Sequence, residues 1–206
     1  WTCALSGAET IHPSTVEAFE ERLAGVGLQK GLTVAAYGLA ENCLVATFGD
    51  PNATDHQTQS ISRDVLETKR RAVAATEDEL ALRLTSLGSP IPGQEVAVVG
   101  PDGDTLPTTH IGEIVIRGAS LMNGYYQRED ATRHKVRNGW LHTGDEGYIS
   151  DGRLFITGRL KRMVIKVGRN IYCDDIEQIA AESLGISVEQ VHACAVPNER
   201  SGSEDV

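Results

Sequence analysis

"GYISDGRLFITG", residues 147–158, places two apolar runs on either side of an aspartate–glycine pair. Asp151 and Gly152 are the residue types that a type I′ turn favours, because both central residues of that turn have positive φ. The stretch therefore predicts a tight β-hairpin, and the hairpin is the clearest structural signal in the chain.

Short strands are also predicted upstream of the hairpin. "GEIVIRG" (112–118) alternates Ile114 and Ile116 with Val115 and Arg117, the period of a half-buried strand. Residues 96–99 form another apolar run, which ends at a Pro-Asp-Gly turn. Several short strands separated by glycine turns indicate a small barrel or a distorted sandwich.

Helix and strand patterns flank this β-rich region on both sides. Residues 12–27 predict a helix that begins near Pro13 and is followed by a buried strand at 31–38. After Gly158, residues 162–168 predict a strand, 174–185 a helix and 188–197 a further strand. The residues expected to face the core are Val16, Phe19, Leu23 and Val26 in the first helix, and Ile176, Ile179, Ala180 and Leu184 in the second.

Together these patterns predict an α/β (α+β) fold in several parts. We expect residues 1–88 to be the end of a layered α/β subdomain and 89–157 a small distorted β-barrel. Residues 158–161 would be a hinge, and 162–206 the start of a small α/β domain. The polar stretch 50–85 is expected to be a surface insertion, with an exposed loop and a short helix over 63–75.

Composition narrows the class of protein. The chain has 206 residues, 40% of them hydrophobic, and a formal net charge of −10. This charge argues against a nucleic-acid partner, which needs a basic face. No apolar run reaches the roughly 18 residues of a membrane helix.

The cysteines indicate a reducing compartment. Cys3, Cys43, Cys173 and Cys194 form no C-x-x-C pair and have no histidine at ligand spacing. We therefore expect reduced, partly buried thiols in a cytoplasmic protein and no zinc site. The chain opens on Trp1 without a methionine and stops just after a strand-like run, which suggests a fragment.

Four motifs occur in a fixed order along the chain: "SGAET" (6–10), "YGLAEN" (37–42), "WLHTGDEGYISDG" (140–152) and "ITGRLKRMVIKVGRNIYCDDIE" (156–177). In this order they resemble the adenylate-forming superfamily, which includes acyl-CoA synthetases, peptide-synthetase adenylation domains and luciferases. The resemblance covers nearly the whole chain and is nearest to fatty acyl-AMP ligases.

The first two motifs are implied to hold the base and the metal. The resemblance places Gly7, Ala8 and Glu9 along an adenine pocket, although "SGAE" alone could be a plain strand-to-helix turn. In the second motif, Tyr37 would stack on adenine and Gly38 would let the chain turn tightly beside the ligand. Glu41 is a hard oxygen ligand of the kind that Mg²⁺ prefers.

The last two motifs are implied to hold the ribose and to form the hinge. Asp145 would accept hydrogen bonds from the ribose hydroxyls, and a solvated turn is the alternative for it. Arg159 would contact the ribose and phosphate region. Lys161 would lie at the hinge, with a solvated charged face as its alternative, and Trp140 is expected to be structural. Gly168 and Asn170 match a loop that faces the active site in one domain state.

The sequence departs from the family at three positions and lacks two of its catalytic parts. Thr10 and Cys173 stand where proline is frequent, and Ala40 stands where many relatives have threonine. The Ser/Thr/Gly-rich phosphate loop of the family normally lies well upstream, and this chain contains no G-x-x-x-x-G-K-[ST] pattern and no obvious substitute. The chain also stops before the catalytic lysine that relatives carry. We therefore assign no catalytic residue within this chain and expect it to be inactive alone.

The resemblance implies ATP-dependent activation of a long-chain fatty acid. ATP, AMP and Mg²⁺ are the expected cofactors, and the acyl-adenylate would pass to an acyl carrier protein. An acyl-CoA synthetase that uses coenzyme A is the first alternative. A degenerate relative that binds nucleotide without turnover is the second, and a purely structural α/β module is the third.

Overall fold

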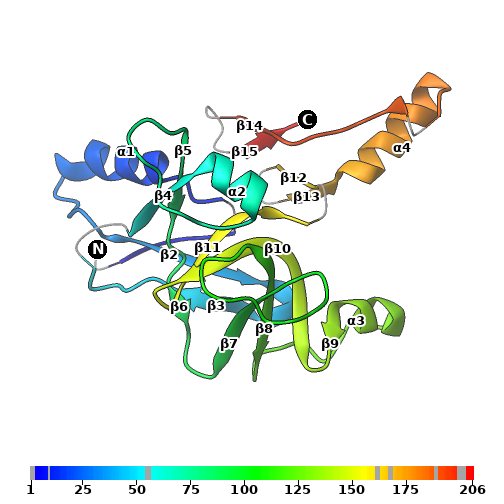
Figure 1. Ribbon diagram of the computed structural model, residues 1–206, viewed down its shortest axis with the longest axis horizontal. Helices are drawn as coiled ribbons and strands as arrows, with labels where there is room; N and C mark the ends of the chain where they lie inside the picture. The colour runs from blue at the N-terminus through cyan, green and yellow to red at the C-terminus, as the bar shows by residue number, and fades with distance from the viewer. Residues whose placement is uncertain are drawn as a thin grey trace. The chain divides into compact units, whose positions relative to one another are not determined.

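The structure, a computed structural model, describes residues 3–8, 10–53, 57–160, 163–166, 169–187, 190–198 and 203–206 (Figure 1). The chain divides into two compact units, Trp1–Gly158 and Arg159–Val206. Each unit is described by itself below. Within the described ranges, no helix has both the length and the apolar character needed to cross a membrane.

The first unit begins with a four-stranded sheet in the order β1-β2-β3-β6. β1 and β2 are parallel, and helix α1 lies between them in the chain, whereas β3 and β6 join in antiparallel pairing. The predicted α/β arrangement is therefore confirmed for this part. The elements are β1 (Ala4–Ser6), α1 (Pro13–Ala24), β2 (Thr33–Leu39), β3 (Leu44–Phe48) and β6 (Ser89–Pro90).

Helix α1 begins at the predicted place but ends at Ala24, before the predicted residue 27, and it does not bury the whole predicted face. Pro13 occupies its first turn, and Gly25 caps its end. Val16 is buried, but Phe19 is 40% exposed and Val26, which lies beyond the helix, is 82% exposed. The predicted face is therefore confirmed at Val16 and wrong at Phe19 and Val26, while Leu23 is half-buried.

A buried carboxylate explains the face that α1 presents. Glu20 is 5% exposed, and its two oxygens accept hydrogen bonds from the amides of Gly31 (3.0 Å) and Thr33 (3.2 Å). Amide groups that are buried without a partner cost free energy, so this contact fixes the helix against the start of β2.

The second part of this unit is a curled sheet in the order β11-β10-β8-β7, with β9 paired to β10 (Figure 1). Asp151 (φ 50°) and Gly152 (φ 73°) both have positive φ between β10 and β11, which confirms the predicted turn. The elements are β7 (Gln94–Val99), β8 (Gly112–Gly118), α3 (Glu129–Lys135), β9 (Val136–Arg137), β10 (Trp140–Ser150) and β11 (Arg153–Arg159).

The two sheets share a core. Ala35 and Tyr37 of β2 belong to the same buried cluster as Ile114 and Ile116 of β8, together with Leu154 of β11. The next residue of β11, Phe155, faces a different cluster, where its ring stacks on Tyr148 with centroids 5.0 Å apart. The β10–β11 hairpin is thus apolar on both faces, which explains its nearly continuous apolar sequence.

The polar stretch 50–85 contributes to the core, contrary to the expectation of a surface insertion. β4 (Thr58–Ser62) pairs in antiparallel fashion with β5 (Ala81–Thr85), and α2 (Arg63–Lys69) follows β4 directly. Ile61 is 2% exposed and packs in the cluster of Tyr148 and Phe155.

The polar side chains of β4 explain why its composition did not predict a strand. Gln59 Oε1 accepts a hydrogen bond of 2.8 Å from the Tyr148 hydroxyl, and burial raises the pKa of that phenol. The short helix predicted within 63–75 is confirmed as α2, where Ser62 Oγ accepts from the amide of Val65.

The second unit is a small α/β arrangement. β12 (Met163–Lys166) pairs with β13 (Arg169–Tyr172), and β14 (Val196–Asn198) pairs with β15 (Ser203–Asp205), both in antiparallel fashion. Helix α4 (Cys173–Leu184) follows β13. The strand predicted over 188–197 is wrong for residues 190–195, which are irregular, and residues 188 and 189 lie outside the described part.

Helix α4 repeats the pattern of α1. Among the residues of α4 whose burial is described, Cys173, Glu177 and Ala181, spaced four apart, are buried, while Ile179 and Leu184 are exposed. Glu177 Oε1 accepts a 2.7 Å hydrogen bond from the amide of Ala193. The predicted apolar face of this helix is therefore wrong at Ile179 and Leu184, because a carboxylate again fixes the face that is buried.

All four cysteines are free thiols. Only Cys173 is buried, whereas Cys3, Cys43 and Cys194 are exposed. The expectation of partly buried thiols is therefore wrong for these three.

Candidate functional site

The first two motifs lie side by side because β1 and β2 are parallel neighbours. Ser6 pairs with Ala35, so Gly7 follows beside Ala36. A Cβ atom on Gly7 would lie 3.0 Å from the Ala36 carbonyl oxygen, so only a glycine allows this approach without a shift. Gly7 and Ala8 are exposed, and Ala8 has a φ of 71°. Glu9 lies outside the described residues.

The second and third motifs meet through a hydrogen bond. The Tyr37 hydroxyl donates to Asp145 Oδ2 over 2.6 Å, although the two residues are 108 positions apart. Tyr37 is 8% exposed and Asp145 is 7% exposed. The alternative of an aspartate in a solvated turn is therefore wrong, because Asp145 is buried within β10.

Asp145 lies in an irregular part of β10. The pairing of β10 with β8 shifts register between His142 and Glu146, and Gly144 has a φ of 81°. We call residues 142–146 the β10 bulge. Inside it, Thr143 Oγ1 donates to the Ile114 carbonyl (2.7 Å) and accepts from the Asp145 amide (3.0 Å).

Two charged residues that sequence reasoning missed also contact the β10 bulge. Glu113 Oε1 accepts from the Gly144 amide at 3.1 Å, and its Oε2 lies 2.7 Å from His142 Nδ1. Lys135 Nζ donates to the carbonyls of His142 (3.2 Å) and Thr143 (3.0 Å). No local sequence pattern pairs residue 113 or 135 with residue 142, so the pairing of β8 with β10 is needed to find them.

Glu41 is held by a loop that precedes α3. It lies in the short 3₁₀ helix η1 (Ala40–Asn42), and its Oε1 accepts a 2.6 Å hydrogen bond from the Tyr125 hydroxyl. Its backbone carbonyl accepts from the Met122 amide at 2.8 Å. Tyr125 was not predicted as a site residue, because nothing in the sequence around it points toward η1.

Gly38 is explained by backbone packing. A Cβ atom there would lie 1.5 Å from the Leu44 carbonyl oxygen, where β2 and β3 shift register between Tyr37 and Gly38. The neighbouring strand, not a ligand, therefore requires the glycine.

Gly38→Ala is expected to lower the free energy of unfolding of the full-length protein by about 2 kcal/mol, because overpacking forces the backbone apart. Urea unfolding measures this change. Gly25→Ala is the matched control, since nothing lies within 4 Å of a Cβ atom at Gly25. Equal stability of both variants would contradict the packing explanation.

The predicted residues of the fourth motif are only partly described. Arg159 ends β11 and begins the second unit. Lys161 and Gly168 lie outside the described residues, and Asn170 is located in β13 by its backbone. Trp140 packs under the guanidinium of Arg117, whose Cζ lies 4.5 Å from the ring centroid, a structural contact of the kind expected.

Glu41 could bind Mg²⁺ only if the phosphates of a bound nucleotide and water supplied the other ligands. No group of three or more histidine, cysteine, aspartate or glutamate side chains that could hold a metal occurs in the described part of the chain. Mg²⁺ is commonly bound by one or two carboxylates together with substrate phosphates and water. A single carboxylate such as Glu41 suits that second mode.

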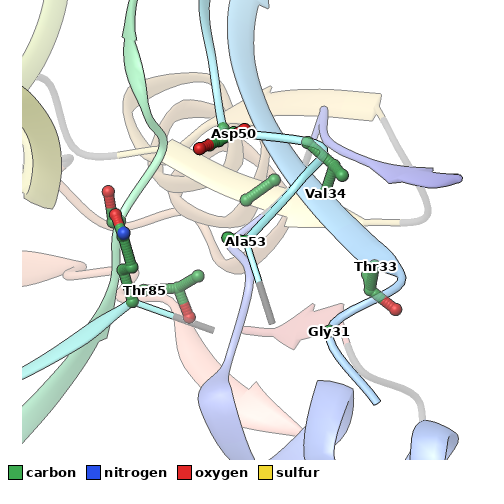
Figure 2. A pocket seen from close by; sticks show the side chains of 10 residues that line it. Gly31, Thr33, Val34, Asp50, Ala53 and Thr85 are labelled. Carbon is green, nitrogen blue, oxygen red and sulfur yellow. The ribbon is translucent and has the colours of Figure 1, made fainter. Parts of the chain in front are cut away.

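A small pocket lies at the opposite end of β2 from Tyr37. Figure 2 shows Thr33, Asp50 and Thr85 among its lining residues. Its volume is about 30 Å³, which suits water and not a nucleotide. Thr33 Oγ1 is buried and has no hydrogen-bond partner among the described residues.

Comparison with known proteins agrees with this arrangement. Residues 1–126 match the family model described as AMP-binding enzyme. The chain is 34% identical over 209 residues to the long-chain-fatty-acid–AMP ligase FadD26 of Mycobacterium marinum, covering 94% of this chain and 35% of that protein. It is 32% identical over 217 residues to the medium-chain-fatty-acid–[acyl-carrier-protein] ligase JamA of Moorena producens, covering 99% and 36%.

Similarity extends to solved structures. The chain matches a structure from a study of fatty acyl-adenylate ligases of E. coli and L. pneumophila with a TM-score of 0.74 and 34% identity. The match covers 88% of this chain and 33% of that one. This chain thus spans about a third of the length of the proteins it resembles, and it belongs to the AMP-binding enzyme family.

Proposed function

We propose that the protein carrying this chain is an AMP-forming acid ligase that activates a fatty acid. A carboxylate oxygen of the acid would attack the α-phosphorus of ATP, forming a new P–O bond. The bond from the α-phosphorus to the bridging oxygen would break, and pyrophosphate would leave. The observation that carries the proposal is the Tyr37–Asp145 hydrogen bond, which joins two motifs of the family in one buried place.

The nucleotide would be held by residues of the first unit. Gly7, Ala8 and Glu9 would line the adenine pocket, with Tyr37 beside it. Asp145 would accept hydrogen bonds from the ribose hydroxyls, as a carboxylate does in dinucleotide sites. The Tyr37 phenol supports this role, because its hydrogen bond restrains the carboxylate.

The phosphates would be approached by Glu41 and Arg159. Glu41 would hold Mg²⁺, with its carboxylate oriented by the Tyr125 hydroxyl. When bound, Mg²⁺ supplies neutralisation of the phosphate charge. Arg159 would contact the ribose and phosphate region, and Lys161 would act as the hinge. The chain would then divide into four parts: an α/β subdomain (1–88), a β-barrel-like subdomain (89–157), the hinge (158–161) and the start of the small domain (162–206).

The acyl group would pass to an acyl carrier protein in the cytoplasm. The name of the relative JamA, a medium-chain-fatty-acid–[acyl-carrier-protein] ligase, supports this acceptor. Coenzyme A is the alternative acceptor, and product analysis of the full-length protein separates the two. Efficient formation of acyl-CoA would favour an ordinary acyl-CoA synthetase.

The proposal is tested by carboxylate-dependent ATP–pyrophosphate exchange. We expect the full-length protein to exchange pyrophosphate when a fatty acid is present. The 206-residue chain alone should remain at background, since it carries neither a Ser/Thr/Gly-rich phosphate loop nor the catalytic lysine of the family. Exchange by the isolated chain would contradict our assignment of catalytic parts outside it.

A further inference from the structure

One carboxylate contacts the β10 bulge on both sides of Thr143. Glu113 accepts from the Gly144 amide with one oxygen and contacts His142 Nδ1 with the other. The Glu113 and His142 side chains are only 19% and 15% exposed. Hydrogen bonds to an ionised group in such a place are stronger than those between neutral groups.

A second charged residue, Lys135 at the end of α3, also forms hydrogen bonds with the backbone of the β10 bulge. Lys135 Nζ donates to the carbonyls of His142 and Thr143, so the two residues before Gly144 are held through their oxygens. Glu113 and Lys135 thus bind the backbone of the bulge by its amide and carbonyl groups respectively.

The bulge needs such contacts because its own pairing is interrupted. Between His142 and Glu146 the register with β8 shifts, so regular ladder hydrogen bonds do not define the backbone there. Gly144, with its φ of 81°, is the most adaptable residue of the segment. Asp145 follows directly, and its direction depends on the conformation of Gly144.

We propose that Glu113, assisted by Lys135, is a positioning residue for Asp145. The two residues fix the bulge so that the Asp145 carboxylate points toward the Tyr37 hydroxyl and toward the ligand. This inference rests on the proposed function, in which Asp145 contacts the ribose. Neither residue touches the nucleotide itself.

The test compares ATP with 2′,3′-dideoxy-ATP, which lacks both ribose hydroxyls, in the full-length protein. A wild-type site that binds the ribose hydroxyls should prefer ATP by about tenfold or more. Glu113→Leu is expected to weaken ATP binding about tenfold while leaving 2′,3′-dideoxy-ATP nearly unchanged, so that the preference disappears. General damage to the fold would weaken both ligands equally, so the ratio identifies a positioning effect.

Two further variants sharpen the comparison. Glu113→Gln should keep the preference, because its amide oxygen still accepts from Gly144 and its NH₂ can donate to His142. Glu95→Leu removes a glutamate from the neighbouring strand β7, where it pairs with Arg117 at the surface, and should also keep it. A lost preference in Glu95→Leu, or a retained one in Glu113→Leu, would overturn the inference.

Asp145→Ala separates this inference from the proposed function. If Asp145→Ala retains the preference, the ribose contact is wrong and the inference falls with it. If Asp145→Ala loses the preference and Glu113→Leu keeps it, only the inference is wrong. Should Glu113→Leu fail to fold, Lys135→Met provides the test, and an unchanged preference in that variant would reject the positioning role.

Discussion

Asp145→Ala in the full-length protein is expected to weaken ATP binding about 100-fold, or about 2.7 kcal/mol. The buried carboxylate would accept hydrogen bonds from the ribose hydroxyls, and hydrogen bonds to charged groups contribute about 1.5–3 kcal/mol each. Removing it also deprives the buried Tyr37 hydroxyl of its acceptor. Isothermal titration calorimetry with ATP measures the loss.

Asp151→Asn is the matched control for this variant. Asp151 lies in the exposed turn of the same hairpin, and asparagine tolerates its positive φ as well as aspartate does. ATP binding should therefore remain at the wild-type level. If Asp145→Ala binds ATP with unaltered affinity, the nucleotide does not bind beside Asp145. A different result would favour a degenerate relative that binds nucleotide without turnover. In that case Asp145→Ala would weaken ATP binding, but the wild-type protein would show no ATP–pyrophosphate exchange.

Glu41→Gln is expected to lower the rate of acyl-adenylate formation by about 100- to 1,000-fold. Glutamine keeps the size of the side chain and can still accept from the Tyr125 hydroxyl, but it lacks the charge that Mg²⁺ needs. Binding of ATP without Mg²⁺ should change little, because Glu41 is not expected to contact the base or the ribose. Rates at saturating ATP over a range of Mg²⁺ concentrations measure the effect.

Glu129→Gln is the control for loss of a carboxylate. Glu129 pairs with Arg133 on the exposed surface of α3, where a neutral substitute should be tolerated. We expect its adenylation rate and its Mg²⁺ dependence to match the wild type. A Glu41→Gln enzyme with a normal rate would exclude Glu41 as the metal ligand.

Local rules predicted the parts of the fold that depend on neighbouring residues. The Asp151-Gly152 turn follows from the φ values that those two residue types tolerate, and the alternation in 112–118 correctly predicted strand β8. Val115 is buried as well as Ile114 and Ile116, so the alternation did not identify a single buried face. The buried faces predicted for α1 and α4 were partly wrong, because hydrophobic periodicity considers only apolar residues and each helix buries a glutamate. Glu20 and Glu177 are buried to satisfy backbone amides in a later segment.

The candidate site shows the same division. Asp145 and Tyr37 could be chosen from their motifs, and the structure brings them into contact. Tyr125, Glu113 and Lys135 could not be chosen, because each acts on a residue that only strand pairing or loop packing brings near. The strand at 58–62 was missed for a related reason, since its glutamine and serine residues resemble those of a loop.

The β10–β11 hairpin also limits how this region can change its length in evolution. Leu154 and Phe155 bury opposite faces in different clusters, so inserting or deleting one residue would exchange the two faces of the strand. Such a change would also rotate the neighbouring positions of β10 away from Tyr37. Insertions should therefore accumulate in loops outside the hairpin, and the spacing between Asp145 and the Asp151-Gly152 turn should vary less among relatives than the sequence around it.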